Sequence, residues 1–118
     1  MKTVDEAYKV LFETKKIMDD LGIEFWLDGG TLLGFVRDGC FPKDDHDDID
    51  ISCWRTDNVS VLCQQLTERF KKAHSIIYNH WNWNDKAHEL SVVKYGIKVD
   101  IFFKERKMMI YNIKERVR

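Results

Sequence analysis

Asp48 and Asp50 have the spacing that could bring two carboxylates to a single cation. Asp48 and Asp50 alternate with Ile49 and Ile51. In a β-strand, side chains two residues apart share one face and lie about 7 Å apart at the backbone. Asp100 alternates with apolar neighbours in the same way on a later segment. Carboxylates crowded on one face repel one another unless a positive partner offsets them, so the pattern predicts a divalent metal site.

The ligand type indicates which metal this would be. All three groups are carboxylates, and no cysteine or histidine stands at metal-ligand spacing with them. Oxygen ligands favour Mg²⁺ or Mn²⁺ over zinc, and Mg²⁺ leaves coordination positions for substrate phosphates. The competing interpretation is a solvated acidic edge strand without a metal.

A Gly-Gly pair precedes the aspartates and could bind phosphate. Gly29 and Gly30 follow a predicted strand over 23–27. Glycine lets a phosphate approach the N–H groups of a helix amino terminus, although an ordinary turn is the alternative. Thr31 is expected to cap that short helix or to donate to a phosphate. Arg37 ends the same helix, where it could contact a phosphate or form a surface ion pair.

Two longer helices are predicted around this stretch. A capping box from Thr3 to Glu6 opens a helix that ends at Gly22. Asp57 or Asn58 can cap another helix, whose apolar face continues to residue 73.

The second half of the chain has β-like patterns. We expect a strand over 75–78, a loop over 80–84, and two strands over 90–95 and 97–103. The last two flank Gly96, which predicts a tight hairpin. A further strand is expected within 104–118.

Composition limits the class of protein. The 118 residues, 44% hydrophobic and 33% charged, suit a single globular domain over 1–118. The net charge of −1 gives no overall field toward nucleic acid, so no nucleic-acid partner is expected. No apolar run approaches the ~20 residues of a membrane helix, so no membrane segment is expected. Three cysteines without CxxC spacing indicate a reduced, cytoplasmic setting in which they act as packing residues.

The stretch FWLDGGTLLGFVRDGCFP followed by DDIDI resembles the LicD and fukutin group of the nucleotidyltransferase superfamily, which also includes DNA polymerase β. The resemblance covers about a third of the chain. It departs from the group in a longer loop after Pro42, in a missing tryptophan after this proline, and in overall length. The resemblance implies an α/β (α+β) nucleotidyltransferase fold, with a mixed β-sheet and helices packed mainly on one face. It assigns Asp48 and Asp50 as metal ligands and Asp100 as a ligand or a base.

A metal-dependent transferase is the function that this resemblance implies. It would move a phosphoryl-linked group from a nucleotide donor, such as CDP-choline or a CDP-polyol, to a hydroxyl of a saccharide-type acceptor. The HDDIDI wording is also similar to that of aminoglycoside nucleotidyltransferases, which transfer a nucleotide from an NTP to a small hydroxyl compound. A third interpretation is a non-catalytic module that binds a nucleotide or a partner. A homodimer could supply the second wall of the cleft.

Overall fold

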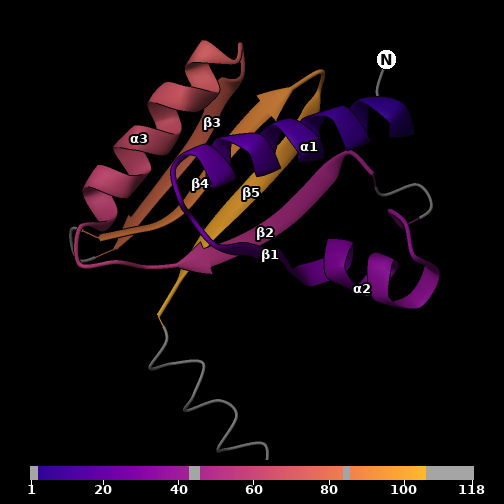
Figure 1. Cartoon of the computed structure of the whole chain (residues 1–118), viewed down its shortest axis with the longest axis horizontal. Helices are drawn as coiled ribbons and strands as arrows, with labels where there is room; N and C mark the ends of the chain where they lie inside the picture. The colour runs from indigo at the N-terminus through magenta and orange to yellow at the C-terminus, as the bar shows by residue number, and fades with distance from the viewer. Residues whose placement is uncertain (1–2, 43–45, 84–85, 106–118) are drawn as a thin grey trace, which may run out of the picture.

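A five-stranded mixed sheet forms the centre of the protein (Figure 1). The computed structural model of the chain describes residues 3–42, 46–83 and 86–105. Across the sheet the strands lie in the order β1 (Phe25–Leu27), β2 (Asp48–Trp54), β5 (Ile97–Lys104), β4 (Lys86–Lys94) and β3 (Ile76–Trp83). β2 and β5 run parallel, whereas every other neighbouring pair is antiparallel. The predicted mixed sheet is therefore confirmed.

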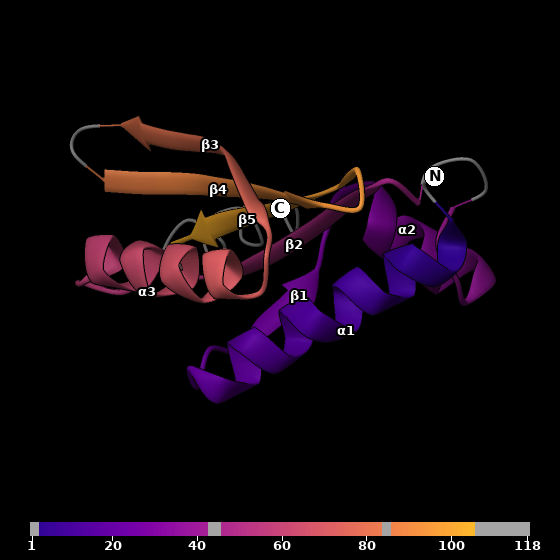
Figure 2. The same ribbon diagram turned by 90° about the horizontal axis from the view of Figure 1, so that it is seen from above.

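In the described part of the chain, three helices accompany the sheet: α1 (Val4–Asp20), α2 (Gly29–Asp38) and α3 (Val59–Lys72). Figure 2 shows α1 and α3 on the same side of the sheet, while α2 lies beyond the end of β1. The Thr3 side chain accepts from the N–H of Glu6, and the Glu6 carboxylate accepts from the N–H of Thr3, so the predicted capping box is present. None of the helices in the described part of the chain is long and apolar enough to span a membrane.

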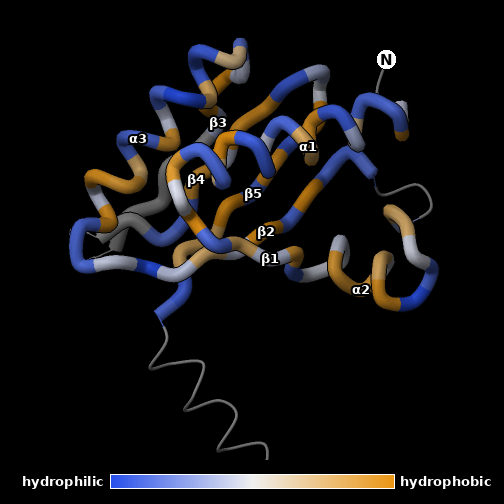
Figure 3. Tube along the Cα trace, in the orientation of Figure 1, coloured by the Kyte–Doolittle hydropathy of each residue, from blue (hydrophilic) through white to orange (hydrophobic). Residues whose placement is uncertain are grey.

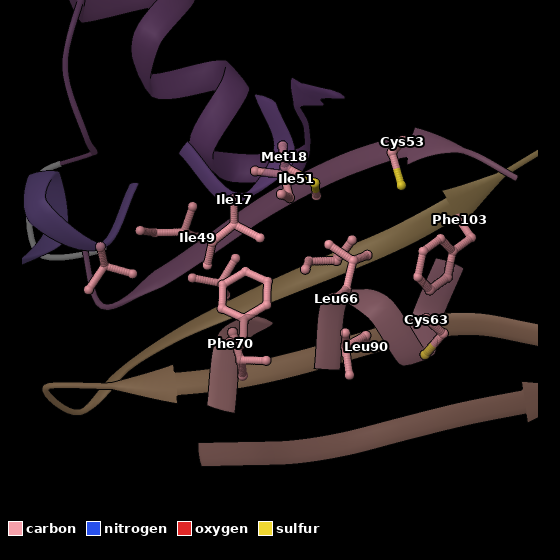
Figure 4. Close-up of a cluster of buried hydrophobic side chains, with 14 of the residues drawn as sticks. Ile17, Met18, Ile49, Ile51, Cys53, Cys63, Leu66, Phe70, Leu90 and Phe103 are labelled. Carbon is pink, nitrogen blue, oxygen red and sulfur yellow. The ribbon is translucent and has the colours of Figure 1, made fainter. Parts of the chain in front are cut away.

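The hydrophobic core lies between the sheet and the helices α1 and α3. Figure 3 shows hydrophobic stretches along β2 and β5 and alternating polarity along α1 and α3. Side chains from both helices meet side chains of the central strands, as Figure 4 shows; among them are Ile17, Met18, Ile49, Ile51, Leu66, Phe70, Leu90 and Phe103. Because apolar side chains fill one face of β2 and β5, the alternating residues of these strands must face away from the helices. The aspartates are among these alternating residues.

The β4–β5 hairpin turns at the residues that the sequence indicates. Tyr95 and Gly96 have φ values of 56° and 74°, and Lys94 pairs with Ile97. Positive φ at both central residues is typical of the two-residue turns that match the twist of a hairpin. The predicted hairpin is confirmed, and its register decides which residues lie beside Asp100.

Two predictions in the second half need correction or lie outside the described residues. The expected loop over 80–84 is wrong as far as Trp83, because β3 continues to that residue. Pairing with β4 extends the strand, and register shifts after Ile77 and Trp81 absorb its irregular pattern. Residue 84 and nearly all of the strand expected within 104–118 lie outside the described residues.

Gly34 holds α2 against the loop that leads to β2. A Cβ atom added at Gly34 would lie 2.6 Å from the Cδ and Cγ atoms of Pro42 and 2.8 Å from its nitrogen. We expect Gly34→Ala to lower the free energy of unfolding by about 1–3 kcal/mol, the usual cost of overpacking. Chemical denaturation measures it, and Pro42→Ala, which removes the ring carbons, is the matched background. An equal cost in both backgrounds would contradict this contact.

Candidate active site

The three aspartates converge where β2 and β5 lie side by side. The parallel register places Asp50 directly opposite Asp100 and Asp48 opposite Lys98. One carboxylate oxygen from each aspartate lies within 4.8 Å of the other two. The three side chains share the sheet face that carries no α1 or α3. We call Asp48, Asp50 and Asp100 the acidic triad.

The three carboxylates of the triad repel one another, and a divalent cation would offset this repulsion. Burial and the charges of Asp48, Asp100 and Asp28 raise the pKa of Asp50 from 3.8 to about 6. A raised carboxyl pKa means that the ionised form is disfavoured where it stands. Three oxygen donors converging from one face suit Mg²⁺ or Mn²⁺, which take oxygen ligands. The donor set therefore fits the metal expected from the sequence.

Two neighbours fix the carboxylate of Asp100. The Ser91 hydroxyl donates to Oδ1 of Asp100 at 2.5 Å, and Lys98 Nζ lies 3.5 Å from Oδ2. The Asp100 side chain is 10% exposed, whereas the Asp48 side chain is 45% exposed. Asp100 is thus the rigid member of the triad, and Asp48 is the accessible one.

The α2 amino terminus lies against the triad. Gly29 is the first residue of α2, and its φ is 53°. A Cβ atom there would lie 2.7 Å from Oδ2 of Asp50, so only glycine leaves room for this carboxylate. Gly30 is exposed in the first turn of the helix. The amides of that turn lack intrahelical acceptors and favour an anion.

Asp28, and not Thr31, caps α2. The Asp28 carboxylate accepts from the N–H of Gly29 at 2.8 Å and from the Ser52 hydroxyl at 2.6 Å, and Lys104 lies 3.8 Å away. Burial opposes ionisation, but the two hydrogen bonds and the Lys104 charge prevail and lower the pKa of Asp28. The predicted cap at Thr31 was wrong because the helix begins two residues earlier.

Thr31 lies within α2 and hydrogen-bonds to the backbone of Asp50. Its side chain is buried, and its hydroxyl accepts from the backbone N–H of Asp50 at 2.9 Å. Thr31→Val keeps the shape but leaves this N–H without its acceptor, which is expected to lower the free energy of unfolding by about 1–3 kcal/mol. Chemical denaturation of Thr31→Val and Thr31→Ser checks this, because serine keeps the hydroxyl. A Thr31→Val protein as stable as Thr31→Ser would contradict the bond's importance.

Arg37 lies away from the triad. It sits at the far end of α2, about 12 Å along the helix from Gly29. Its Nε is 3.5 Å from Oδ2 of Asp38, and both side chains are more than half exposed. This contact is the surface ion pair that the sequence left open as an alternative.

A groove of about 520 Å³ adjoins the triad on the side of β3 and β4. It is lined by Asp47, Asp48, Ile76, Tyr78, Val93, Gly96 and Lys98. Ile76 and Tyr78 are 69% and 67% exposed. The groove therefore combines an apolar wall with charged groups, and it shares Asp48 with the triad.

Sequence reasoning assigned no role to Ser91, Lys98 or Asp28. Counting outward from the two-residue turn at Tyr95 and Gly96 would have paired Ser91 with Asp100, as the hairpin register does. Lys98 is two residues before Asp100 and so shares its face. Asp28 directly precedes the glycine pair, the position of a helix cap.

Comparison with known proteins agrees with this geometry. The family model described as "LicD/FKTN/FKRP, nucleotidyltransferase domain" matches residues 22–115. The chain belongs to this family. The matched LicD range includes the glycine pair, both strands of the acidic triad and the hairpin, so the resemblance read from the motifs is confirmed.

Two relatives of this LicD domain come from Rickettsia, and both are described as uncharacterized proteins. RP689 of Rickettsia prowazekii is 28% identical over 107 residues, which cover 89% of this chain and 36% of RP689. RT0683 of Rickettsia typhi is 35% identical over 66 residues, which cover 55% of this chain and 20% of RT0683. The chain thus spans about a third or less of the curated relatives that it matches.

Proposed function

We propose that this LicD-family domain transfers a phosphoryl-linked group from a nucleotide donor to a hydroxyl acceptor, with Mg²⁺ or Mn²⁺ held by Asp48, Asp50 and Asp100. We propose a CDP-activated donor, of the CDP-choline or CDP-polyol type, and a saccharide-type acceptor; membership of the LicD family is what supports this choice. The observation that carries the proposal is the register of β2 and β5, which sets Asp50 directly opposite Asp100.

The proposed chemistry is a displacement at phosphorus. The acceptor oxygen forms a bond to the donor phosphorus, the bond from this phosphorus to the oxygen of the leaving nucleotide breaks, and the hydroxyl proton passes to a carboxylate. A bound divalent ion would polarise the phosphoryl oxygens and offset the charge of the leaving group. Asp100 Oδ2, the oxygen that Ser91 does not hold, is the candidate proton acceptor if Asp100 acts as a base.

The amino terminus of α2 is the proposed phosphate site. The Gly29 N–H already donates to the Asp28 carboxylate, so the amides that follow it in the first turn, where Gly30 is exposed and has no side chain, are the ones open to a phosphate. The helix dipole favours an anion there. Asp28 and the triad, however, put four carboxylates around that position, against the two nearby ammonium groups of Lys98 and Lys104. A phosphate should therefore bind only when a divalent cation is present.

Differential thermal denaturation tests this proposal. CDP-choline, a CDP-polyol, CTP and ATP are added with and without Mg²⁺. We expect a metal-dependent rise in melting temperature with at least one cytidine nucleotide, because a ligand of the native state stabilises it by mass action. Asp50→Asn should lose this rise in melting temperature. Its matched control is Asp38→Asn, which removes an exposed carboxylate at the far end of α2 and should keep the rise. No metal-dependent rise with any nucleotide would count against the proposal.

Mass spectrometry of the product identifies what is transferred. With isotope-labelled CDP-choline and a polyol or saccharide acceptor, the proposal predicts labelled phosphocholine on the acceptor and release of CMP. Nucleotidyl transfer from an NTP would instead place the nucleotide on the acceptor. Nucleotide binding without either product would favour a non-catalytic binding module.

A further inference from the structure

Lys98 lies where a cation for the triad would be expected. Its Nζ is 3.5 Å from Oδ2 of Asp100 and 3.9 Å from Oδ1 of Asp48. The Lys98 charge also lowers the pKa of Asp50, opposing the burial and the carboxylate charges that raise it. One ammonium group thus interacts with all three carboxylates of the triad.

On the side of the groove, Lys98 has an aromatic neighbour. The side chain is 38% exposed, and its Nζ lies 5.8 Å from the centre of the Tyr78 ring. Lys98 lines the groove together with Tyr78 and Ile76. An ammonium group over the face of an aromatic ring gains a cation–π attraction, so moving toward Tyr78 would leave the charge with a favourable neighbour.

A divalent ion and this ammonium group cannot both be satisfied by the triad. Both would bind carboxylates of the triad, and two positive charges a few ångströms apart repel each other. A divalent ion carries twice the charge of the ammonium group and would be held by the carboxylates directly, so it should prevail at sufficient concentration. Metal binding then has to include the loss of the two contacts of Lys98.

We propose that Lys98 is a built-in counter-ion of the acidic triad, which a divalent metal displaces toward the groove beside Tyr78. The proposal rests on the metal site proposed above. Its consequence is that Lys98 weakens metal binding by the free protein and stabilises the metal-free triad. When metal is bound, the displaced ammonium group lies at the edge of the groove.

Direct Mn²⁺ titration, followed by electron paramagnetic resonance of the free ion, tests the proposal. Lys98→Met keeps most of the stem and removes the charge, so Mn²⁺ should bind roughly 3- to 10-fold more tightly, the range expected for losing exposed ion pairs. Lys98→Arg keeps the charge and should bind within about 2-fold of wild type. Lys104→Met is the matched control, since this lysine is on the same strand and faces Asp28.

Thermal denaturation gives a second readout that separates this role from a purely structural one. Metal-free Lys98→Met should melt at a lower temperature than the metal-free wild type. Its melting temperature should nevertheless rise more than that of the wild type when saturating Mn²⁺ is added. A merely structural role would lower both melting temperatures equally.

Three results would overturn the proposal. The first is unchanged or weaker Mn²⁺ binding by Lys98→Met while the wild type binds Mn²⁺, which would leave the proposed metal site intact. The second is an equal increase in Mn²⁺ affinity in Lys104→Met, because it would mean that removing any nearby positive charge has the same effect. The third is no Mn²⁺ binding by either wild type or Lys98→Met, which would reject the proposed metal site as well.

Discussion

Asp50→Asn is expected to remove the stabilisation that Mg²⁺ or Mn²⁺ gives the wild type and, at the same time, to make the metal-free protein more stable. At a metal concentration of 100 times Kd, a single site contributes about 2.7 kcal/mol to the wild type. The amide would replace a carboxylate that we propose as a ligand of a hard cation, so the variant should keep little of this stabilisation. Transfer activity should fall with it.

The higher stability expected of the metal-free Asp50→Asn protein follows from the raised pKa of Asp50. Burial and the neighbouring carboxylates raise this pKa to about 6, so the folded protein binds this proton more tightly than the unfolded chain does. The contribution of protonated Asp50 to the free energy of unfolding is therefore complete below about pH 4 and is lost as the pH rises through about 6. Solvent screening reduces the effect to about 1–2 kcal/mol. Asp50→Asn should flatten this part of the pH profile and be more stable at pH 7.

Chemical denaturation between pH 4 and pH 8, with metal and with a chelator, measures both effects. Asp38→Asn is again the control, because its carboxylate is exposed and lies at the far end of α2. A metal-free Asp50→Asn protein that is less stable than the wild type at pH 7 would contradict the electrostatic account. Undiminished metal stabilisation in the variant would contradict its role as a ligand.

Gly29→Ala is expected to weaken both the fold and Mn²⁺ binding at the proposed metal site. The residue has a φ of 53°, and its new Cβ would lie 2.7 Å from Oδ2 of Asp50. Left-handed backbone costs a residue with a side chain about 1–2 kcal/mol. Displacing the Asp50 carboxylate adds to this, so we expect a loss of about 2–4 kcal/mol of unfolding free energy. Mn²⁺ affinity should drop at least ~10-fold, because a ligand misplaced by the new methyl group cannot coordinate well.

Gly39→Ala separates the two causes. Gly39 has a φ of 72°, and a Cβ atom there meets no heavy atom within 4 Å. The variant should show the backbone cost alone, about 1–2 kcal/mol, with the Mn²⁺ affinity of the wild type. Chemical denaturation and Mn²⁺ titration of both variants give the comparison. Equal Mn²⁺ affinities in Gly29→Ala and Gly39→Ala would show that the contact with Asp50 does not matter.

The sequence predicted the elements whose local chemistry and tertiary packing agree. The capping box at Thr3, the alternation around Asp48 and Asp50, and the turn at Tyr95 and Gly96 each depend on neighbouring residues, and all three are confirmed. The buried side of α1 is not fixed by local pattern alone: Val10 and Ile17 are buried, whereas the apolar Val4 is 46% exposed. Which side of an amphipathic helix is central depends on the strands beneath it.

Features that depend on distant partners were beyond sequence reasoning. β3 extends to Trp83 only because β4 pairs with it, and Thr31 is buried because it accepts from the N–H of Asp50, nineteen residues away. Cysteine packing was predicted correctly for Cys53 and Cys63, which are buried, but was wrong for Cys40, which is exposed. The convergence of the triad required the parallel register of β2 and β5, which no local pattern specifies.

The position of β5 between β2 and β4 has a consequence for how the site comes into existence. Of the described strands it is the last along the chain, yet it fills an interior slot of the sheet. A folding intermediate with β1, β2 and α3 in place would still lack the third carboxylate, together with Lys98. Competence to bind the proposed metal therefore requires the long-range pairing of β5 with β2, so Mn²⁺ capture during refolding would report when this pairing forms.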